Sequence, residues 1–167
     1  MLFKKTCYYE INLIQKGVVA RLVLKNAKQG KTVKTLKIDE KLHVTETMVD
    51  KDLLLYLGLT NDNNPLFIQH EYTAKTVFKH PIVPQIMLNG IITSTISKHL
   101  PGPGSYIKRQ TIKYLAPVYH DETIDFIFQV SEIDIKQNDV TISVVAKNLK
   151  NEKVIEGVLK VAPPSLK

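Results

Sequence analysis

The residues best suited to catalysis lie in a short polar loop, Thr60-Asn-Asp-Asn-Asn-Pro65. Asp62 carries a carboxylate that a partly buried loop would desolvate, and the neighbouring Asn64 would orient it. Such a carboxylate acts as a general acid or base when a second group completes the proton transfer. The alternative for both residues is an Asx-turn, because Asp and Asn side chains accept hydrogen bonds from nearby backbone N–H groups.

A second proton-transfer group would come from the five histidines of the chain. His70 lies three residues after Phe67, so a helix that starts near Phe67 puts the two on neighbouring parts of one face. His80 stands immediately before a proline at the start of a rigid segment. The alternative for both is an ordinary surface histidine with no local partner. Neither the histidines nor the single Cys7 make a spacing that resembles a zinc site, so we expect no bound metal.

Length and composition are those of one globular domain that spans residues 1–167, with 44% hydrophobic and 23% charged residues. The formal net charge of +7 favours an anionic partner such as phosphates, an acidic carrier protein or nucleic acid. The lone Cys7 excludes a disulfide-stapled fold and is typical of a reducing cytosol, so we expect a cytoplasmic protein. No apolar stretch reaches the roughly 20 residues that span a bilayer, so we expect no membrane association.

The first 44 residues read as a β-rich extension within this domain. Two β-branched apolar runs, Val18–Leu24 and Val33–Ile38, flank a stretch that ends at Gly30. Because Asn and Gly accept the positive φ that hairpin connections need, these runs predict a β-hairpin.

Two short helices are predicted before the middle of the chain. Thr45 or Thr47 as a cap, Asp50 in the first turn and a run of leucines predict a helix that stops at Gly58. The stretch Gln69–Val77 predicts a second short helix after the polar loop.

The strongest helical pattern is Gln85–His99, in which Ile86, Leu88, Ile91, Ile92 and Ile96 bury one side. Because nearly all of it is apolar or small, the helix is expected to be buried rather than to lie on the surface. Pro101-Gly-Pro-Gly104 ends it. Alternating patterns then predict four strands in an antiparallel meander: Tyr106–Leu115, Thr123–Val130, Val140–Ala146 and Val154–Val161. The fold class is therefore α+β, with an antiparallel sheet wrapped around one long central helix.

The order and spacing of motifs between Glu46 and Thr123 resemble those of the MaoC-like hydratases and dehydratases. The motifs are Leu59–Leu66, Glu71-Tyr72, Pro81–Pro84, Met87-Leu88, Leu100–Gly104 and Leu115–Val118. That family includes the (R)-specific enoyl-CoA hydratases and 3-hydroxyacyl thioester dehydratases of fatty acid metabolism. The resemblance implies a hot-dog fold, a homodimer with the active site at its interface, an acyl-CoA or an acyl-carrier protein as partner, and no cofactor beyond that thioester substrate.

Two positions depart from the family pattern. An Asp-x-Asn-Pro-x-His element supplies the family's catalytic Asp and His; by position these are Asp62 and, in place of the histidine, Phe67. The family also has a Gly in a Pro-Ile-x-x-Gly-Met-Leu segment, whose nearby backbone N–H polarises the thioester carbonyl. Gln85 occupies that slot here and Ile86 follows it. Both changes affect the chemistry rather than the fold.

The candidate catalytic residues are therefore Asp62, Asn64 and His70. The candidate substrate-binding residues are Phe67, Pro84, Gln85, Ile86, Lys108 and Arg109. Gln85 keeps a backbone N–H at a helix N-terminus, and its side chain either donates to a carbonyl or plugs the pocket. Lys108 and Arg109 line CoA or carrier-arm phosphates or form a solvated strand face; since no nucleic-acid module accompanies them, we expect no nucleic acid.

These residues leave three functions open. The first is syn addition of water to an enoyl thioester, or its removal from a 3-hydroxyacyl thioester, with Asp62 acting alone or with His70 or His80. The second is an acyl-thioester binding protein or subunit that kept the fold and lost the histidine. The third is a hot-dog thioesterase in which Asp62 or Asn64 positions water and Gln85 contacts the carbonyl.

Overall fold

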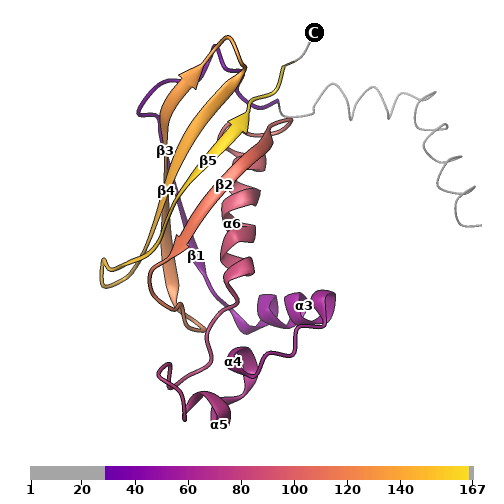
Figure 1. The fold of residues 1–167 in the computed structure, drawn as a ribbon, viewed down its shortest axis with the longest axis vertical. Helices are drawn as coiled ribbons and strands as arrows, with labels where there is room; N and C mark the ends of the chain where they lie inside the picture. Colours follow the sequence, from indigo (N-terminus) through magenta and orange to yellow (C-terminus); the bar gives the residue numbers. More distant parts are fainter. Residues whose placement is uncertain (1–28, 166–167) are drawn as a thin grey trace, which may run out of the picture.

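The structure, a computed structural model, describes residues 29–165, so the first run of the predicted hairpin, Val18–Leu24, lies outside the described residues. One five-stranded antiparallel sheet has the order β1-β3-β4-β5-β2 and packs one face against a single long helix, α6 (Gln85–Lys98) (Figure 1). Its strands are β1 (Lys41–Thr47), β2 (Tyr106–Tyr114), β3 (Thr123–Asp134), β4 (Asp139–Asn148) and β5 (Lys153–Ala162). The α+β class, the four predicted C-terminal strands and the hot-dog arrangement are confirmed. The predicted meander of these four strands is wrong for β2, which pairs with β5 at the sheet edge and not with β3.

The core lies between α6 and the middle of the sheet. Alternate residues of β3, from Ile124 to Val130, are fully buried, as the period of two requires. Ile92 and Ile96 of α6 are also fully buried and belong to the same cluster. The register pairs Phe126 of β3 with Ala146 of β4, so one large and one small side chain lie opposite each other in the core.

The prediction of a strand over Val33–Ile38 is wrong. This segment runs as turns, with Val33 and Leu36 buried. The Gly30 N–H donates to the Pro103 carbonyl (3.0 Å), which ties the segment to the turn after α6. A Cβ at Gly30 would lie 2.6 Å from that same carbonyl oxygen, so this close approach requires glycine. The apolar residues of the run are therefore used to cover the core rather than to pair as a strand.

The first helix, α3 (Asp50–Thr60), begins and ends later than predicted. Thr47 lies in β1, and Val49 is the N-cap without a side-chain hydrogen bond. The helix passes through Gly58, because one glycine costs only about 1 kcal/mol inside a helix. It ends where Asn61 adopts the left-handed conformation (φ 53°) and its N–H bonds the Leu57 carbonyl.

The predicted second helix, Gln69–Val77, is instead two single turns, α4 (Pro65–Ile68) and α5 (His70–Thr73). The Asn64 side chain accepts a hydrogen bond from the Leu66 N–H and so caps α4, which begins earlier than predicted. Extended backbone at Gln69 then separates the two turns.

The prediction that α6 is a buried helix rather than a surface-lying one holds for one side only. Leu88 and Ile92 face the sheet, whereas Gln85 and Gly90 are exposed and Ile86 is 54% exposed. The sheet of one chain covers only one side of the helix, which leaves the opposite side open. The bounds of α6 agree with the predicted helix to within one residue.

Candidate active site

The three short helices form a unit, the helical segment (residues 50–73), at the N-terminal end of α6 (Figure 1). It has a small hydrophobic cluster whose buried members are Leu53, Phe67 and Ile82. Phe67, which the motif resemblance assigns to the position of the family's catalytic histidine, is 7% exposed. Its ring is therefore part of the packing that holds the helical segment against the chain before α6, and it has no group that transfers a proton.

Asp62 is half-buried and held from two sides. The Tyr56 hydroxyl donates to Asp62 Oδ2 (2.9 Å), and the Asn64 N–H donates to Asp62 Oδ1 (3.1 Å). The second bond is the Asx-turn that the loop composition predicts. The first is not local turn geometry, because it joins the carboxylate to a side chain of the preceding helix. Asp62 therefore makes the turn and also holds a carboxylate in a defined place.

Tyr56 is a candidate site residue that the sequence analysis missed. It lies in the leucine-rich helix α3, where nothing in the pattern distinguishes it from a packing residue. The left-handed turn at Asn61 reverses the chain and brings the loop back to the tyrosine. Burial, together with the hydrogen bond and the negative charge of Asp62, raises the pKa of the Tyr56 hydroxyl. The phenol therefore remains a protonated donor at neutral pH.

The other candidate catalytic residues do not join this pair. Asn64 uses its side-chain oxygen to cap α4. His70 and His80 are exposed, and among the described residues neither imidazole hydrogen-bonds to Asp62. The structure thus brings together Asp62 and Tyr56 rather than Asp62 and a histidine.

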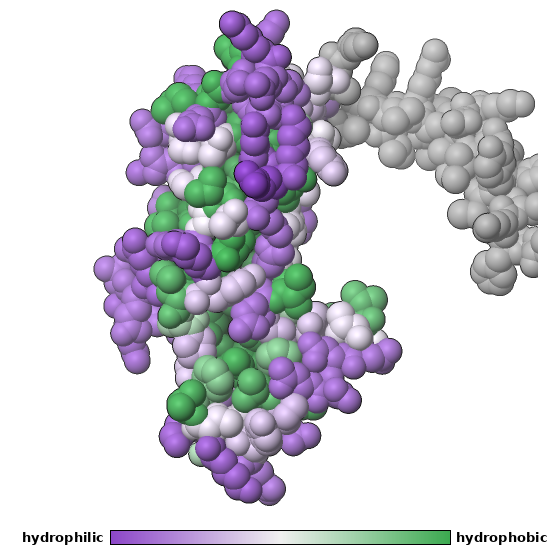
Figure 2. Space-filling view, in the orientation of Figure 1, coloured by the Kyte–Doolittle hydropathy of each residue, from purple (hydrophilic) through white to green (hydrophobic). Residues whose placement is uncertain are grey.

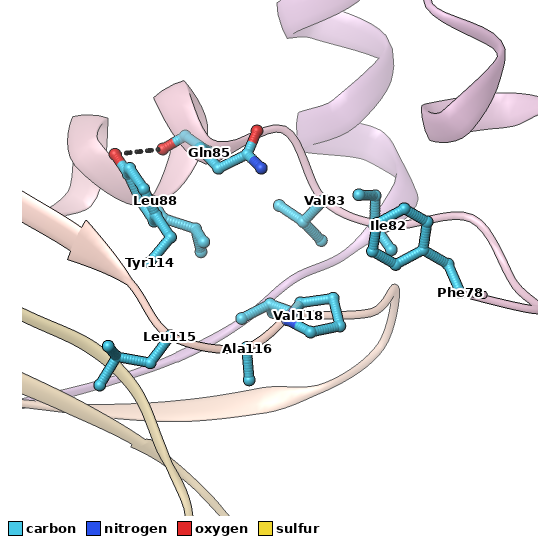
Figure 3. Close-up of a pocket in the computed structure, with 10 residues that line it drawn as sticks. Phe78, Ile82, Val83, Gln85, Leu88, Tyr114, Leu115, Ala116 and Val118 are labelled. Carbon is cyan, nitrogen blue, oxygen red and sulfur yellow. Dashed lines mark hydrogen bonds between the residues drawn. The ribbon is translucent and has the colours of Figure 1, made fainter. Parts of the chain in front are cut away.

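A pocket of about 220 Å³ opens beside the N-terminus of α6 (Figure 3). Its walls are apolar and come from the chain before α6, from α6 itself and from the segment after β2; they are Phe78, Ile82, Val83, Leu88, Leu115, Ala116, Pro117 and Val118. On the surface, apolar residues gather where the lower end of the sheet meets the helical segment (Figure 2). The described part of the chain thus offers a small apolar site next to a helix N-terminus.

Two polar side chains, Gln85 and Tyr114, complete the lining of this pocket. The Tyr114 hydroxyl donates to the Gln85 backbone carbonyl (3.2 Å), and burial raises the pKa of that hydroxyl. The Gln85 carboxamide turns toward Val83 at the edge of the pocket, with no hydrogen-bond partner among the described residues (Figure 3). Pro84 is the buried N-cap of α6. Ile86 is exposed and does not line the pocket.

Lys108 and Arg109 lie toward the other end of β2 and do not line the pocket. Lys108 pairs with the buried carboxylate of Asp139, which also binds Lys160 (3.1 Å). Hydrogen bonding to Lys108, and to Lys160, lowers the pKa of Asp139 against the opposing effect of burial. Arg109 is exposed beyond a bulge in the strand. A role for these two residues in binding phosphates stays a prediction.

Within residues 29–165, no three His, Cys, Asp or Glu side chains are arranged to hold a metal ion. In the same part of the chain, none of the helices has the length and apolar character needed to cross a membrane.

Comparison with known proteins shows the family of the chain. Residues 26–153 match the family described as MaoC like domain. The chain is 28% identical over 130 residues to the (R)-specific enoyl-CoA hydratase of Rhodospirillum rubrum, covering 78% of this chain and 90% of the relative. It is 32% identical over 135 residues to a mitochondrial 3-hydroxyacyl-acyl-carrier-protein dehydratase of Solanum lycopersicum, covering 78% and 79%.

A solved structure of an R-hydratase is similar to this chain in fold. The unliganded R-hydratase PhaJ1 from Pseudomonas aeruginosa matches with a TM-score of 0.76 at 25% identity, over 83% of this chain and 88% of that one. The matched region includes the Asp62 loop, the helical segment and all of α6. The chain belongs to the MaoC-like domain family and has its hot-dog fold.

Proposed function

We propose that this protein adds water to a 2-enoyl thioester, or removes it from a 3-hydroxyacyl thioester, in fatty acid metabolism. The observation that carries the proposal is the Asp62 carboxylate, which occupies the family's catalytic-Asp position and is fixed by the Tyr56 hydroxyl and the Asn64 N–H. A carboxylate held in this way is suited to take a proton from water. The names of the relatives, a hydratase and a dehydratase, support the same reaction in its two directions.

The N-terminus of α6 supports binding of the thioester carbonyl. Helix N-termini present unpaired N–H groups and favour negative charge, which develops on the carbonyl oxygen as water adds. The Pro84 cap supplies no side chain to those N–H groups, and the Gln85 carboxamide adds a further donor at the pocket edge. The apolar walls then accept a short acyl chain, which is the specific role we propose for the pocket beside α6.

A homodimer is the proposed assembly, in the cytoplasm and without a cofactor. β2 is an edge strand whose side chains are mostly exposed, and the side of α6 away from the sheet is open. A sheet edge of this kind accepts another strand. The acyl group is carried by CoA or by an acyl-carrier protein, and assays with both thioesters distinguish the two. The names of the relatives include a CoA thioester and an acyl-carrier-protein thioester.

Hydration of crotonyl-CoA tests the proposal, followed as loss of the conjugated-enoyl absorbance. The wild type should consume the enoyl band, and Asp62→Asn should not, although it keeps the side-chain shape and the fold. Release of free CoA thiol without hydration would instead indicate a thioesterase. A wild type that leaves crotonyl-CoA and a crotonyl carrier protein unchanged overturns the hydratase proposal.

Acyl-thioester binding without turnover is a second candidate, favoured by the burial of Phe67 at the histidine position. Loss of one member of a cooperating acid and base pair removes most activity when nothing replaces it. This function predicts that calorimetry detects crotonyl-CoA binding to a wild type without turnover, and that Asp62→Asn binds equally well. In that case Phe67→His should create hydration activity in a pocket that already binds the thioester.

A further inference from the structure

We propose that Tyr56 is the second proton-transfer group of this site. It protonates the α-carbon of the substrate and so takes the place of the histidine that this chain lacks. This inference rests on the proposed hydratase function. It concerns a residue that the family motif does not include, and it follows from the pairing of the Tyr56 hydroxyl with Asp62.

The geometry supplies a direct proton path between the two groups. The Tyr56 hydroxyl lies 2.9 Å from Asp62 Oδ2, within the range of a strong hydrogen bond. The Asn64 N–H holds the other oxygen, Oδ1, at 3.1 Å. Each carboxylate oxygen has a second lone pair, so Asp62 can still accept a bond from a water molecule. Both side chains are half-buried, so part of each is exposed, and neither belongs to the lining of the pocket beside α6.

The pairing is selective among the described tyrosines. Tyr114 and Tyr119 donate their hydroxyls to backbone carbonyls, of Gln85 and Phe78 respectively. Within residues 29–165, Tyr56 alone donates to a carboxylate. The Thr60 hydroxyl bonds the Tyr56 carbonyl (2.8 Å) and also accepts from the Asp62 N–H (3.3 Å), so the same threonine links the helix end to the loop. The pair is therefore fixed through its backbone as well as its side chains.

The proton balance of hydration closes through this hydrogen bond. Asp62 takes a proton from water while the water oxygen forms a bond to C3, and the electrons of the C2–C3 double bond move onto the thioester oxygen. The enolate then returns those electrons to C2, which takes the hydroxyl proton of Tyr56. The protonated Asp62 passes its proton to the Tyr56 phenolate, and both groups are restored with one water added.

The surroundings keep the Tyr56 hydroxyl protonated. Burial and Asp62 raise the pKa of the hydroxyl, so at neutral pH it holds a proton that only a strong base such as the enolate carbon takes. Since both groups come from one helix end and its loop, they approach the substrate from one side. Hydroxyl and proton are then delivered to the same face, which is the syn outcome.

Tyr56→Phe tests the proposal in the full-length protein, because it removes only the hydroxyl. Tyr72→Phe is the matched control: Tyr72 is 48% exposed, and its hydroxyl has no hydrogen-bond partner among the described residues. The measurements are kcat and KM for crotonyl-CoA hydration, the thermal midpoint, and the position of deuterium at C2 of product formed in D₂O at low conversion.

We expect Tyr56→Phe to lower kcat by about 10²–10⁴-fold with KM unchanged, as loss of a general acid does, while Tyr72→Phe matches the wild type. The wild type should place deuterium on one face of C2. Residual product from Tyr56→Phe should carry deuterium on both faces, because solvent then protonates the enolate. If Tyr56→Phe lowers the thermal midpoint strongly, Tyr56→His is used as the test variant, because imidazole also transfers protons. Tyr56→His should then deliver deuterium to one face of C2.

Two results overturn the inference alone: an active wild type with an equally active Tyr56→Phe, or a slow Tyr56→Phe that still delivers deuterium to one face. The latter would make Tyr56 a positioning residue for Asp62. A wild type without hydration activity overturns the proposed function, and this inference with it.

Discussion

Replacing Phe67 by histidine restores the family's residue and should destabilise this protein. The ring is 7% exposed and packs with Leu53 and Ile82. Burial of a phenylalanine side chain stabilises a fold by roughly 1.5–3 kcal/mol. Imidazole keeps part of that packing but brings ring nitrogens that lack partners there, each costing about 1–3 kcal/mol when buried.

Together these effects predict a loss of about 2–4 kcal/mol in the free energy of unfolding. For a domain of this size that corresponds to a fall in thermal midpoint of roughly 4–16 °C. The loss should grow below about pH 6.5, since a protonated imidazole is costlier to bury and its folded-state pKa is depressed. Chemical denaturation with guanidinium, read by circular dichroism at pH 8 and pH 6, measures both effects.

Ile68→His is the matched control, because it adds the same imidazole at the adjacent position, which is 43% exposed. Its effect should stay within about 0.5 kcal/mol, as for other surface substitutions. If Phe67→His is as stable as the wild type, Phe67 does not have the packing role that the structure gives it. Hydration activity of Phe67→His, measured alongside, shows whether a histidine there reaches substrate or remains in the cluster.

Two further substitutions test the sheet. Gly157→Ala in β5 would place its Cβ 2.7 Å from a backbone carbonyl oxygen of β2, so it should cost about 1–3 kcal/mol of stability by overpacking. Its guanidinium midpoint should be lower than that of the control Gly58→Ala, whose Cβ has open space. Equal midpoints would contradict the close approach. Asp139→Asn should lower the thermal midpoint at neutral pH because the lysine-paired carboxylate has a lowered pKa. A carboxylate whose pKa is lowered in the folded state stabilises the fold at pH values above its unfolded pKa of about 3.9. The difference in thermal midpoint between wild type and Asp139→Asn should therefore shrink as the pH falls below about 4. A difference that persists at about pH 2 would refute this linkage.

The strands and the central helix could be predicted from the sequence because their periodicity is strong and local. Ile124 to Val130 alternate with a period of two, and the same residues alternate between buried and half-buried in the structure. The position of Asp62 in a turn was also predictable, since its Asx-turn bond to Asn64 spans only two residues.

The strand predicted over Val33–Ile38 could not be judged from its own residues. A β-branched apolar run is compatible with a strand or with a segment that covers a core, and the contact of Gly30 with Pro103, far along the chain, decides for the latter. Likewise, the apolar composition of α6 does not say how much of its surface one sheet covers, so its open side, which includes Ile86, appears only in the fold.

The sequence by itself determined the fold class and the family, and it predicts two departures from the family motif, at Phe67 and Gln85, because all of these depend on short-range pattern and motif order. Only the tertiary structure decided which side chains surround Asp62 and Phe67. Phe67 is buried in a cluster formed by three separate parts of the chain, and Tyr56 meets Asp62 because the left-handed turn at Asn61 folds the loop back onto α3. Contacts of this kind depend on where the chain reverses direction, which residue types alone do not specify.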